Sequence, residues 1–359
     1  MANIDIRRFV DINIVHHKIS TVKSIRDTVV LFTSEGSDKQ PIVVSSLAEF
    51  NAYDNDSEMT TTKTYVTQFF NCNGNKIYIV PNKVTVTLDD IKALKDEYIV
   101  IAFVGSSYYQ NALTLIDSYN EDSTIYGIKS KIFLLRLPSM AAAVQVRDSL
   151  AMKYSPTNDG VEMSIAAYLS NIDVYGSNTI QDYAFTQENV KAEENNDNTL
   201  KFVIDNNINV DMTIGNTVRN LGGNMVNGND LVNEFALIVL QQTLTERVLN
   251  LLVEKIKGNK GLAAIKTTMS QELGKYLING YLTTDKIWTD ETLYVTDSHG
   301  VTHTIIEKNT PLTLGYYITI LPLSSLSDAD KKNRQTPAIY LIVADSYGIR
   351  KVTISGEVI

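Results

Sequence analysis

Short apolar runs and longer amphipathic stretches alternate along the N-terminal half of the chain. Four runs rich in β-branched residues predict strands at 28–33, 76–80, 98–104 and 131–137. Apolar residues at helical spacing predict helices at 45–53, 61–70, 87–97, 107–119 and 138–154. Because strands that alternate with helices are typical of a mixed sheet covered by helices, this half predicts an α/β domain.

The C-terminal half begins with polar sequence and ends in strands. The stretch 187–199 predicts a solvated loop, and 201–214 predicts a strand pair. Asp230 is expected to start a helix that runs to Lys257 and is buried on more than one side, because its apolar residues surround most of the axis. A second helix is expected at 261–278. The remaining runs predict strands at 291–296, 301–307, 316–323, 338–344 and 349–359, so this half predicts an α+β domain.

Both ends of the chain carry alternating apolar residues, which predict terminal strands. The apolar members are Ile4, Ile6, Val10, Ile12 and Ile14 at one end, and Val352, Ile354 and Val358 at the other. A terminal strand either finishes its own sheet or completes the sheet of a neighbouring copy. The second alternative predicts that these eight residues carry strand exchange between subunits. Each exchanged strand would form about five main-chain hydrogen bonds, each contributing ~0.5 to 1.5 kcal/mol.

We therefore expect three parts along the chain. These are an N-terminal strand arm (1–24), an α/β domain (25–225) and a C-terminal α+β domain (226–359) that ends in a second strand arm. The linker-like stretch TVKSIRD, which follows the first strand, would let the N-terminal arm leave its own body.

Composition and charge restrict the partners. The 359 residues carry a net charge of -9 at pH 7, whereas binding to nucleic acid or to an anionic membrane needs clustered Lys and Arg. No run reaches the ~20 apolar residues of a membrane span, and the start MANIDIRRFV lacks the apolar core of a signal peptide. We expect no nucleic-acid partner, no membrane insertion, and a protein made and used in the cytosol. Cys72 is the single cysteine, so no intramolecular disulfide forms, and we interpret it as an inert thiol.

The four histidines offer little for catalysis or metal binding. His16 and His17 are neighbours on the predicted N-terminal strand, so their side chains point to opposite faces and do not reach one ion. The sequence DSHG at 297–300 contains the residue types of a catalytic triad, but between two strands it is typical of a hairpin turn. On a strand, the four-residue spacing of His299 and His303 separates them by about 13 Å.

A phosphate site is not expected either. Gly222 and Gly223 could suggest a phosphate loop, but no Lys-Ser/Thr pair follows at the required position, and Gly-Gly pairs serve turns more often. No GxSxG, HExxH, Walker or Rossmann fingerprint occurs in the required context. The sequence therefore predicts no catalytic residue, no cofactor and no metal site, and the chain is not expected to be an enzyme.

Seven stretches in a fixed order carry a family resemblance. They are PIVVSSLAEFNAYDND, TYVTQFFNCNGNKIYIVP, IAAYLSNIDVYGSNTIQDYAF, the Asn-Ile-Asn of residues 207–209, GNMVNGNDLVNEF, NKGLAAIKTTMSQELGKYLINGYL and RQTPAIYLIVADSYGIRKVTISGEV. In this order they resemble contractile tail sheath proteins of bacteriophages and phage-tail-like particles, in the compact form without large surface insertions. The last stretch is similar to the Arg-x-x-Pro strand and closing strand of sheath C-terminal domains.

The resemblance implies partners and a mechanism. It implies a homo-oligomer of stacked helical rings around a tail tube, linked by exchanged terminal strands, with baseplate and tail terminator proteins as further partners. It implies contraction from a high-energy extended state, without a nucleotide, to drive the tube through a bacterial envelope. The protein would lie in the virion or phage-tail-like particle, after assembly in the bacterial host cytoplasm.

The resemblance does not extend to proteolysis. The family's middle domain is sometimes called subtilisin-like for its topology, but no protease triad can be placed in this sequence, so hydrolysis is not implied. Two alternatives stay open. One is another phage or phage-like structural protein, such as a tail tube or capsid protein, and the other is an α/β enzyme with an unrecognised site.

Overall fold

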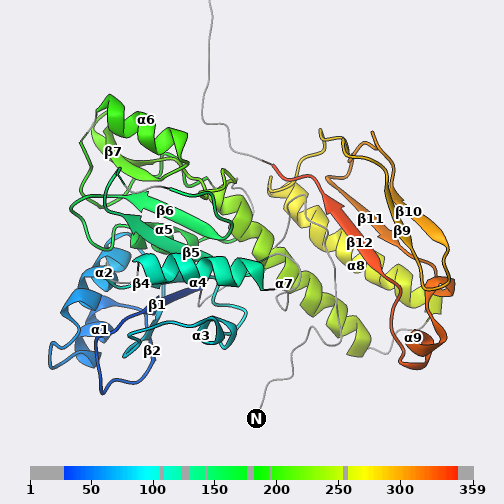
Figure 1. Ribbon diagram of the computed structural model, residues 1–359, viewed down its shortest axis with the longest axis horizontal. Helices are drawn as coiled ribbons and strands as arrows, with labels where there is room; N and C mark the ends of the chain where they lie inside the picture. The colour runs from blue at the N-terminus through cyan, green and yellow to red at the C-terminus, as the bar shows by residue number, and fades with distance from the viewer. Residues whose placement is uncertain are drawn as a thin grey trace, which may run out of the picture.

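The structure is a computed structural model in which two parts of the chain meet along one long helix (Figure 1). It describes residues 28–105, 109–122, 129–141, 144–175, 182–194, 196–253 and 258–346. The N-terminal part (28–226) is an α/β unit, and the C-terminal part (231–346) contains two long helices and two small sheets. The fold class is therefore the mixed α/β class that the sequence predicts.

A six-stranded sheet forms the centre of the N-terminal part. The strand order is β2-β3-β1-β4-β5-β6, and only β2 runs antiparallel to its neighbour. The strands are β1 (Val29–Phe32), β2 (Ile42–Val44), β3 (Ile77–Val80), β4 (Val100–Phe103), β5 (Ile132–Leu137) and β6 (Leu150–Tyr154). Four of these strands confirm the sequence prediction, whereas β2 and β6 were not predicted.

Helices cover both faces of this sheet, and the alternation of side chains along each strand separates two cores. Val29 and Leu31 point into the core shared with the first helix group, while Val30 and Phe32 point into the core shared with the second. The first group is α1 (Leu47–Tyr53), α2 (Thr60–Asn71) and α5 (Met163–Ser170). The second group is α3 (Leu88–Lys92), α4 (Tyr109–Glu121) and α6 (Asp197–Asp205). Strand β1 is apolar throughout because both of its faces are covered.

Two sequence predictions in this part are wrong. The segment 138–154 was expected to be helical, but its last five residues form β6, because pairing with β5 outweighs the helix preference of the sequence LAMKY. Residues 201–205 were expected to be a strand, but they belong to α6, which Asn196 caps by accepting a hydrogen bond from Thr199 N. The strand pair is shorter than predicted and consists of β7 (Val210–Ile214) and β8 (Thr217–Leu221).

The long helix α7 (Leu231–Val253) joins the two parts. Asp230 caps it by accepting a hydrogen bond from Asn233 N at 2.9 Å. From Leu231 to Leu240 every side chain except Glu234 is buried, which confirms the predicted burial on more than one side. Its apolar residues belong to the same core as the sheet strands and α8 (Gly258–Ile278). No helix in the described part of the chain is long and apolar enough to cross a membrane.

Two small antiparallel sheets complete the C-terminal part, with α8 between them and α7 (Figure 1). One sheet contains β9 (Leu293–Thr296) and β10 (Thr302–Ile306), and the other contains β11 (Tyr316–Ile320) and β12 (Ile339–Val343). The short helix α9 (Asp328–Lys332) lies in the connection between β11 and β12. Four of the predicted C-terminal strands are confirmed, and the fifth, 349–359, lies outside the described residues.

Candidate functional site

In a doubly wound sheet, ligands usually bind outside the carboxyl ends of the strands at the point where the strand order reverses, and here it reverses at β1, between β3 and β4. Here the Glu35 carboxylate fills the place that an anion would take at the start of α2. It accepts hydrogen bonds from the N–H groups of Thr61 (3.0 Å) and Thr62 (2.8 Å) and from the Thr62 hydroxyl (2.7 Å). Burial acts to raise the pKa of Glu35, but these hydrogen bonds lower it below its ordinary value. A phosphate at this position would therefore compete with an internal carboxylate.

The backbone of the Gly222–Gly223 turn also binds a side chain of the protein itself, that of Asn209. The Asn209 side chain is completely buried, and its Oδ1 accepts a hydrogen bond from Gly223 N at 2.6 Å. Its Nδ2 donates to Met152 O (3.0 Å) and to Asn224 O (2.9 Å). Gly222 has a φ of +124°, and a Cβ added there would lie 2.9 Å from Asn209 Oδ1. The glycine pair thus serves a tight turn against Asn209, as the sequence predicts.

The DSHG sequence forms the predicted hairpin turn between β9 and β10. Asp297 N donates to Val301 O, and the Asp297 carboxylate accepts from His299 N (2.9 Å) and contacts His303 Nε2 (2.8 Å). The contact with His303 is the largest cause that lowers the pKa of Asp297 to about 2. Ser298 Oγ and His299 Nε2 face the carbonyl oxygens of residues 325 and 326 instead of each other. The triad geometry is therefore not formed.

A buried cluster of charged and polar side chains lies between β6, β7 and α5. Its centre is Lys153, which is completely buried, and its Nζ lies 2.5 Å from Glu188 Oε2 and 2.8 Å from Asp211 Oδ1. Ser164 Oγ (2.6 Å) and Tyr183 OH (2.9 Å) complete the surroundings of the ammonium group. Sequence reasoning missed this cluster, because Glu188 lies in the stretch predicted to be solvated and Lys153 in a predicted helix. The available signal was a lysine inside the apolar run LAMKY.

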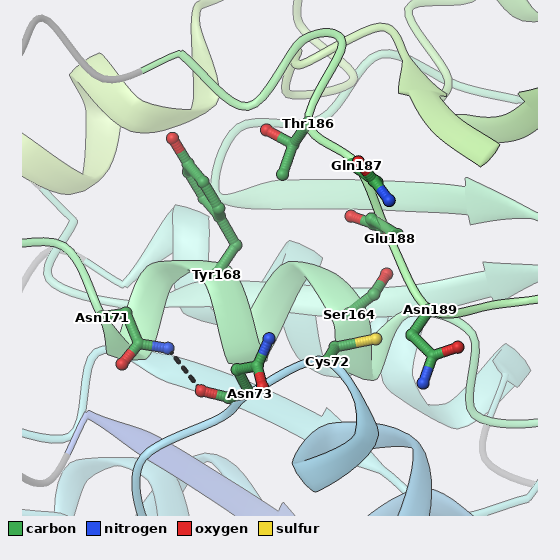
Figure 2. A pocket seen from close by; sticks show the side chains of 9 residues that line it. All are labelled: Cys72, Asn73, Ser164, Tyr168, Asn171, Thr186, Gln187, Glu188 and Asn189. Carbon is green, nitrogen blue, oxygen red and sulfur yellow. Dashed lines mark hydrogen bonds between the residues drawn. The ribbon is translucent and has the colours of Figure 1, made fainter. Parts of the chain in front are cut away.

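A pocket of about 370 Å³ lies beside this cluster, between the end of α2, α5 and the segment 186–189 (Figure 2). Its lining residues are Cys72, Asn73, Ser164, Tyr168, Asn171, Thr186, Gln187, Glu188 and Asn189. Asn171 Nδ2 donates to Asn73 O at 2.7 Å across one wall. The Glu188 side chain is only 3% exposed, so a molecule in the pocket would meet neutral amide and hydroxyl groups before a charge.

The sheet of β11 and β12 has an unpaired edge within the described residues. The hydrogen bonds from Ala344 N to Gly315 O and from Leu321 N to Ala338 O fix the alternation of the ladder. In this register the backbone N–H and C=O groups of Ile339, Leu341 and Val343 point away from β11. Strand β11 contacts β10 through the bond from Thr319 Oγ1 to Ile305 O, whereas no described strand pairs with the outer edge of β12. Such an edge is a template for a strand from elsewhere.

The residues predicted to exchange between subunits lie outside the described part of the chain. These are Ile4, Ile6, Val10, Ile12, Ile14, Val352, Ile354 and Val358. Their strand exchange stays a prediction. Within the described residues, no group of three or more His, Cys, Asp or Glu side chains is arranged to hold a metal ion.

Residues 232–358 match the sequence family described as "E217 tail sheath protein gp31-like, C-terminal domain". The C-terminal third of the chain is thus similar to the C-terminal domain of tail sheath proteins. The match covers both long helices and both small sheets, including the unpaired edge of β12. No curated protein matches the sequence.

Solved structures extend the likeness of fold to nearly the whole chain. The helical sheath protein of the anti-feeding prophage in its contracted state is 12% identical, with a TM-score of 0.59. The alignment covers 94% of this chain and 95% of the sheath chain. A chain in the contracted baseplate structure of the same prophage is 14% identical, with a TM-score of 0.61 and coverage of 95% and 96%. A sheath tail protein from Listeria innocua is 6% identical, with a TM-score of 0.51 and coverage of 91% and 96%. The α/β part therefore has the tail sheath fold as well.

Proposed function

We propose that the chain is the structural subunit of a contractile tail sheath, which polymerises around a tail tube and contracts to drive the tube through a bacterial envelope. The sheath-domain match of residues 232–358 carries this proposal. The sheath fold over the rest of the described chain supports it. A structural role also fits the two places where a phosphate could have bound backbone N–H groups. At the start of α2 and at Gly222–Gly223, the side chains of Glu35 and Asn209 accept these hydrogen bonds instead.

Subunits would be linked by the terminal arms, residues 1–24 and the closing strand of 226–359. The outward backbone groups of β12 support this, because an added strand would give them hydrogen-bond partners. The eight alternating residues from Ile4 to Ile14 and from Val352 to Val358 would then bury their side chains against a neighbouring copy. Tail tube, baseplate and tail terminator proteins are the further proposed partners, and assembly would take place in the host cytoplasm.

Deletion of residues 1–20 tests the proposal. The full-length chain should form hollow cylinders in negative-stain micrographs, and cylinders of two diameters should occur if the sheath contracts. The deletion should leave a folded monomer with the same far-UV circular dichroism that forms no cylinders. Normal tubular assembly of the deletion would refute strand exchange by the N-terminal arm, and a full-length chain that never forms tubes would refute the sheath function.

A further inference from the structure

The Lys153 cluster contains one carboxyl group more than its ammonium can serve. Lys153 Nζ donates hydrogen bonds to Glu188 Oε2, Ser164 Oγ and Tyr183 OH, which uses all three hydrogens of an ammonium. Asp211 Oδ1 forms an ion pair with the same nitrogen at 2.8 Å, so four oxygens compete for three hydrogens. Glu188 Oε1 and both Asp211 oxygens are buried without a donor. With both acids ionised, the cluster would hold a net negative charge and three unsatisfied oxygens away from water.

The neighbouring titratable groups do not correct this imbalance. Burial raises the pKa of the Cys72 thiol to about 11 at the end of α2, and that of Glu162 to about 7 at the start of α5. Burial also holds the pKa of Tyr183 well above its ordinary value. Among the described residues that face the cluster, Lys153 is therefore the one positive charge for Glu188 and Asp211. A bound proton is the remaining way to balance the cluster.

We propose that one proton shared by Asp211 and Glu188 is a latch that fixes segment 182–194 to the sheet, and that loss of this proton in alkaline solution releases the segment. The proton resides on Asp211, which then donates a hydrogen bond to Glu188 and removes the repulsion between the two acids. Burial raises the pKa of Asp211 to about 8. Burial also acts to raise the pKa of Glu188, but the Lys153 ammonium lowers it.

Segment 182–194 has the attachments that such a latch requires. Its backbone bonds go to the β7–β8 hairpin, from Phe185 N to Asn220 O (2.8 Å) and from Glu188 N to Val218 O (3.1 Å). The cluster links it to β6 and α5 through Glu188 and Tyr183, next to the hydrogen bonds from Ser155 Oγ to Glu193 Oε1 (2.5 Å) and from Tyr168 OH to Asp182 O (3.1 Å). An ionised Asp211 would repel Glu188, which lies on the segment itself. The segment would then leave β6 and expose more of Cys72, which is half-buried and lines the same pocket as Glu188 (Figure 2).

The direction of the pH effect follows from the two states of Asp211. The closed latch keeps its proton up to about pH 8, whereas an open, solvated aspartate loses it near pH 4. The stabilisation from this proton is thus largest below about pH 4, declines as the pH rises, and is gone above about pH 8. Between pH 7 and pH 9 the open population should grow roughly tenfold, as one released proton requires.

Labelling of Cys72 with a thiol reagent tests the latch in the full-length chain. At each pH the labelling rate of the wild type is divided by that of Asp211→Asn, in which an amide imitates the protonated acid. The pH dependence of the thiol's own ionisation is common to both proteins and cancels in this ratio. The ratio should rise roughly tenfold from pH 7 to pH 9. A constant ratio overturns the proposal.

A second measurement does not depend on the folding of Asp211→Asn. The urea midpoint of the wild type should fall between pH 7.5 and pH 9, and Glu162→Gln should show the same fall. A flat wild-type midpoint overturns the proposal. A fall that disappears in Glu162→Gln assigns the proton to Glu162 and overturns it as well.

Discussion

Lys153 Nζ lies 2.5 Å from Glu188 Oε2, although 35 positions separate the two residues and neither side chain is more than 3% exposed. The pair connects β6 to the irregular segment 182–194, which also bonds to the β7–β8 hairpin and to Tyr168 of α5. Lys153→Met should therefore destabilise the chain strongly, because it leaves the buried Glu188 carboxylate without a counter-charge. We expect a loss of about 3 to 5 kcal/mol in the free energy of unfolding, measured by urea denaturation at pH 7.

Lys201→Met is the matched control for Lys153→Met. Lys201 forms a pair of similar length with Asp205 (2.6 Å), but its side chain is 78% exposed. Solvent screens such a pair, so the control should have the urea midpoint of the wild type. Equal losses in the two variants would show that burial does not decide the strength of the Lys153 contacts.

Asn209→Ala should destabilise the chain through the loss of a buried amide. The Asn209 side chain links Gly223 N, Met152 O and Asn224 O, and so fixes the turn before α7 to the edge of β6. Truncation to alanine leaves the buried Gly223 N–H group without a hydrogen-bond acceptor. We expect a loss of about 2 to 3 kcal/mol in the free energy of unfolding, measured by thermal or urea denaturation. Asn206→Ala, which removes only the half-buried bond to Phe202 O, should cost less than about 1 kcal/mol; a reversed order would contradict the role of Asn209.

Glu35→Gln should weaken the start of α2. The ionised Glu35 accepts three hydrogen bonds from Thr61 and Thr62, and these lower its pKa. The stabilisation is therefore present above the ordinary pKa near 4.5 and is lost as the pH falls through the lowered value. At pH 7 the substitution should cost about 1 kcal/mol, because Glu35 is partly exposed and acts as a helix cap. The difference in urea midpoint between wild type and variant should shrink from pH 6 to pH 3, and a constant difference would refute the electrostatic part of this account.

The sequence predicted elements better than it predicted polar contacts. Runs of β-branched residues such as VVLF, and the apolar residues on most sides of α7, are local signals in the sequence. They allowed β1, β3, β4, β5 and both long helices to be predicted. Strand β6 was missed because its partner β5 decides its conformation, and no local pattern encodes that pairing. The cluster of Lys153, Glu188 and Asp211 was missed for a related reason. Glu188 lies in a polar stretch, which gives no sign that folding will bury it, and the lysine inside the apolar run LAMKY was the available signal.

Ile339→Pro tests whether the outer edge of β12 accepts a strand from another subunit. The Ile339 N–H points away from β11, so proline removes an outward donor without breaking a bond between β11 and β12. The variant should keep the far-UV circular dichroism of the wild type and remain monomeric in sedimentation velocity under conditions in which the wild type forms tubes. Ile339→Val keeps the N–H group and nearly the same side chain, and it should assemble normally. Tubes formed equally by both variants would exclude this edge as the acceptor and leave the exchanged strands to pair elsewhere.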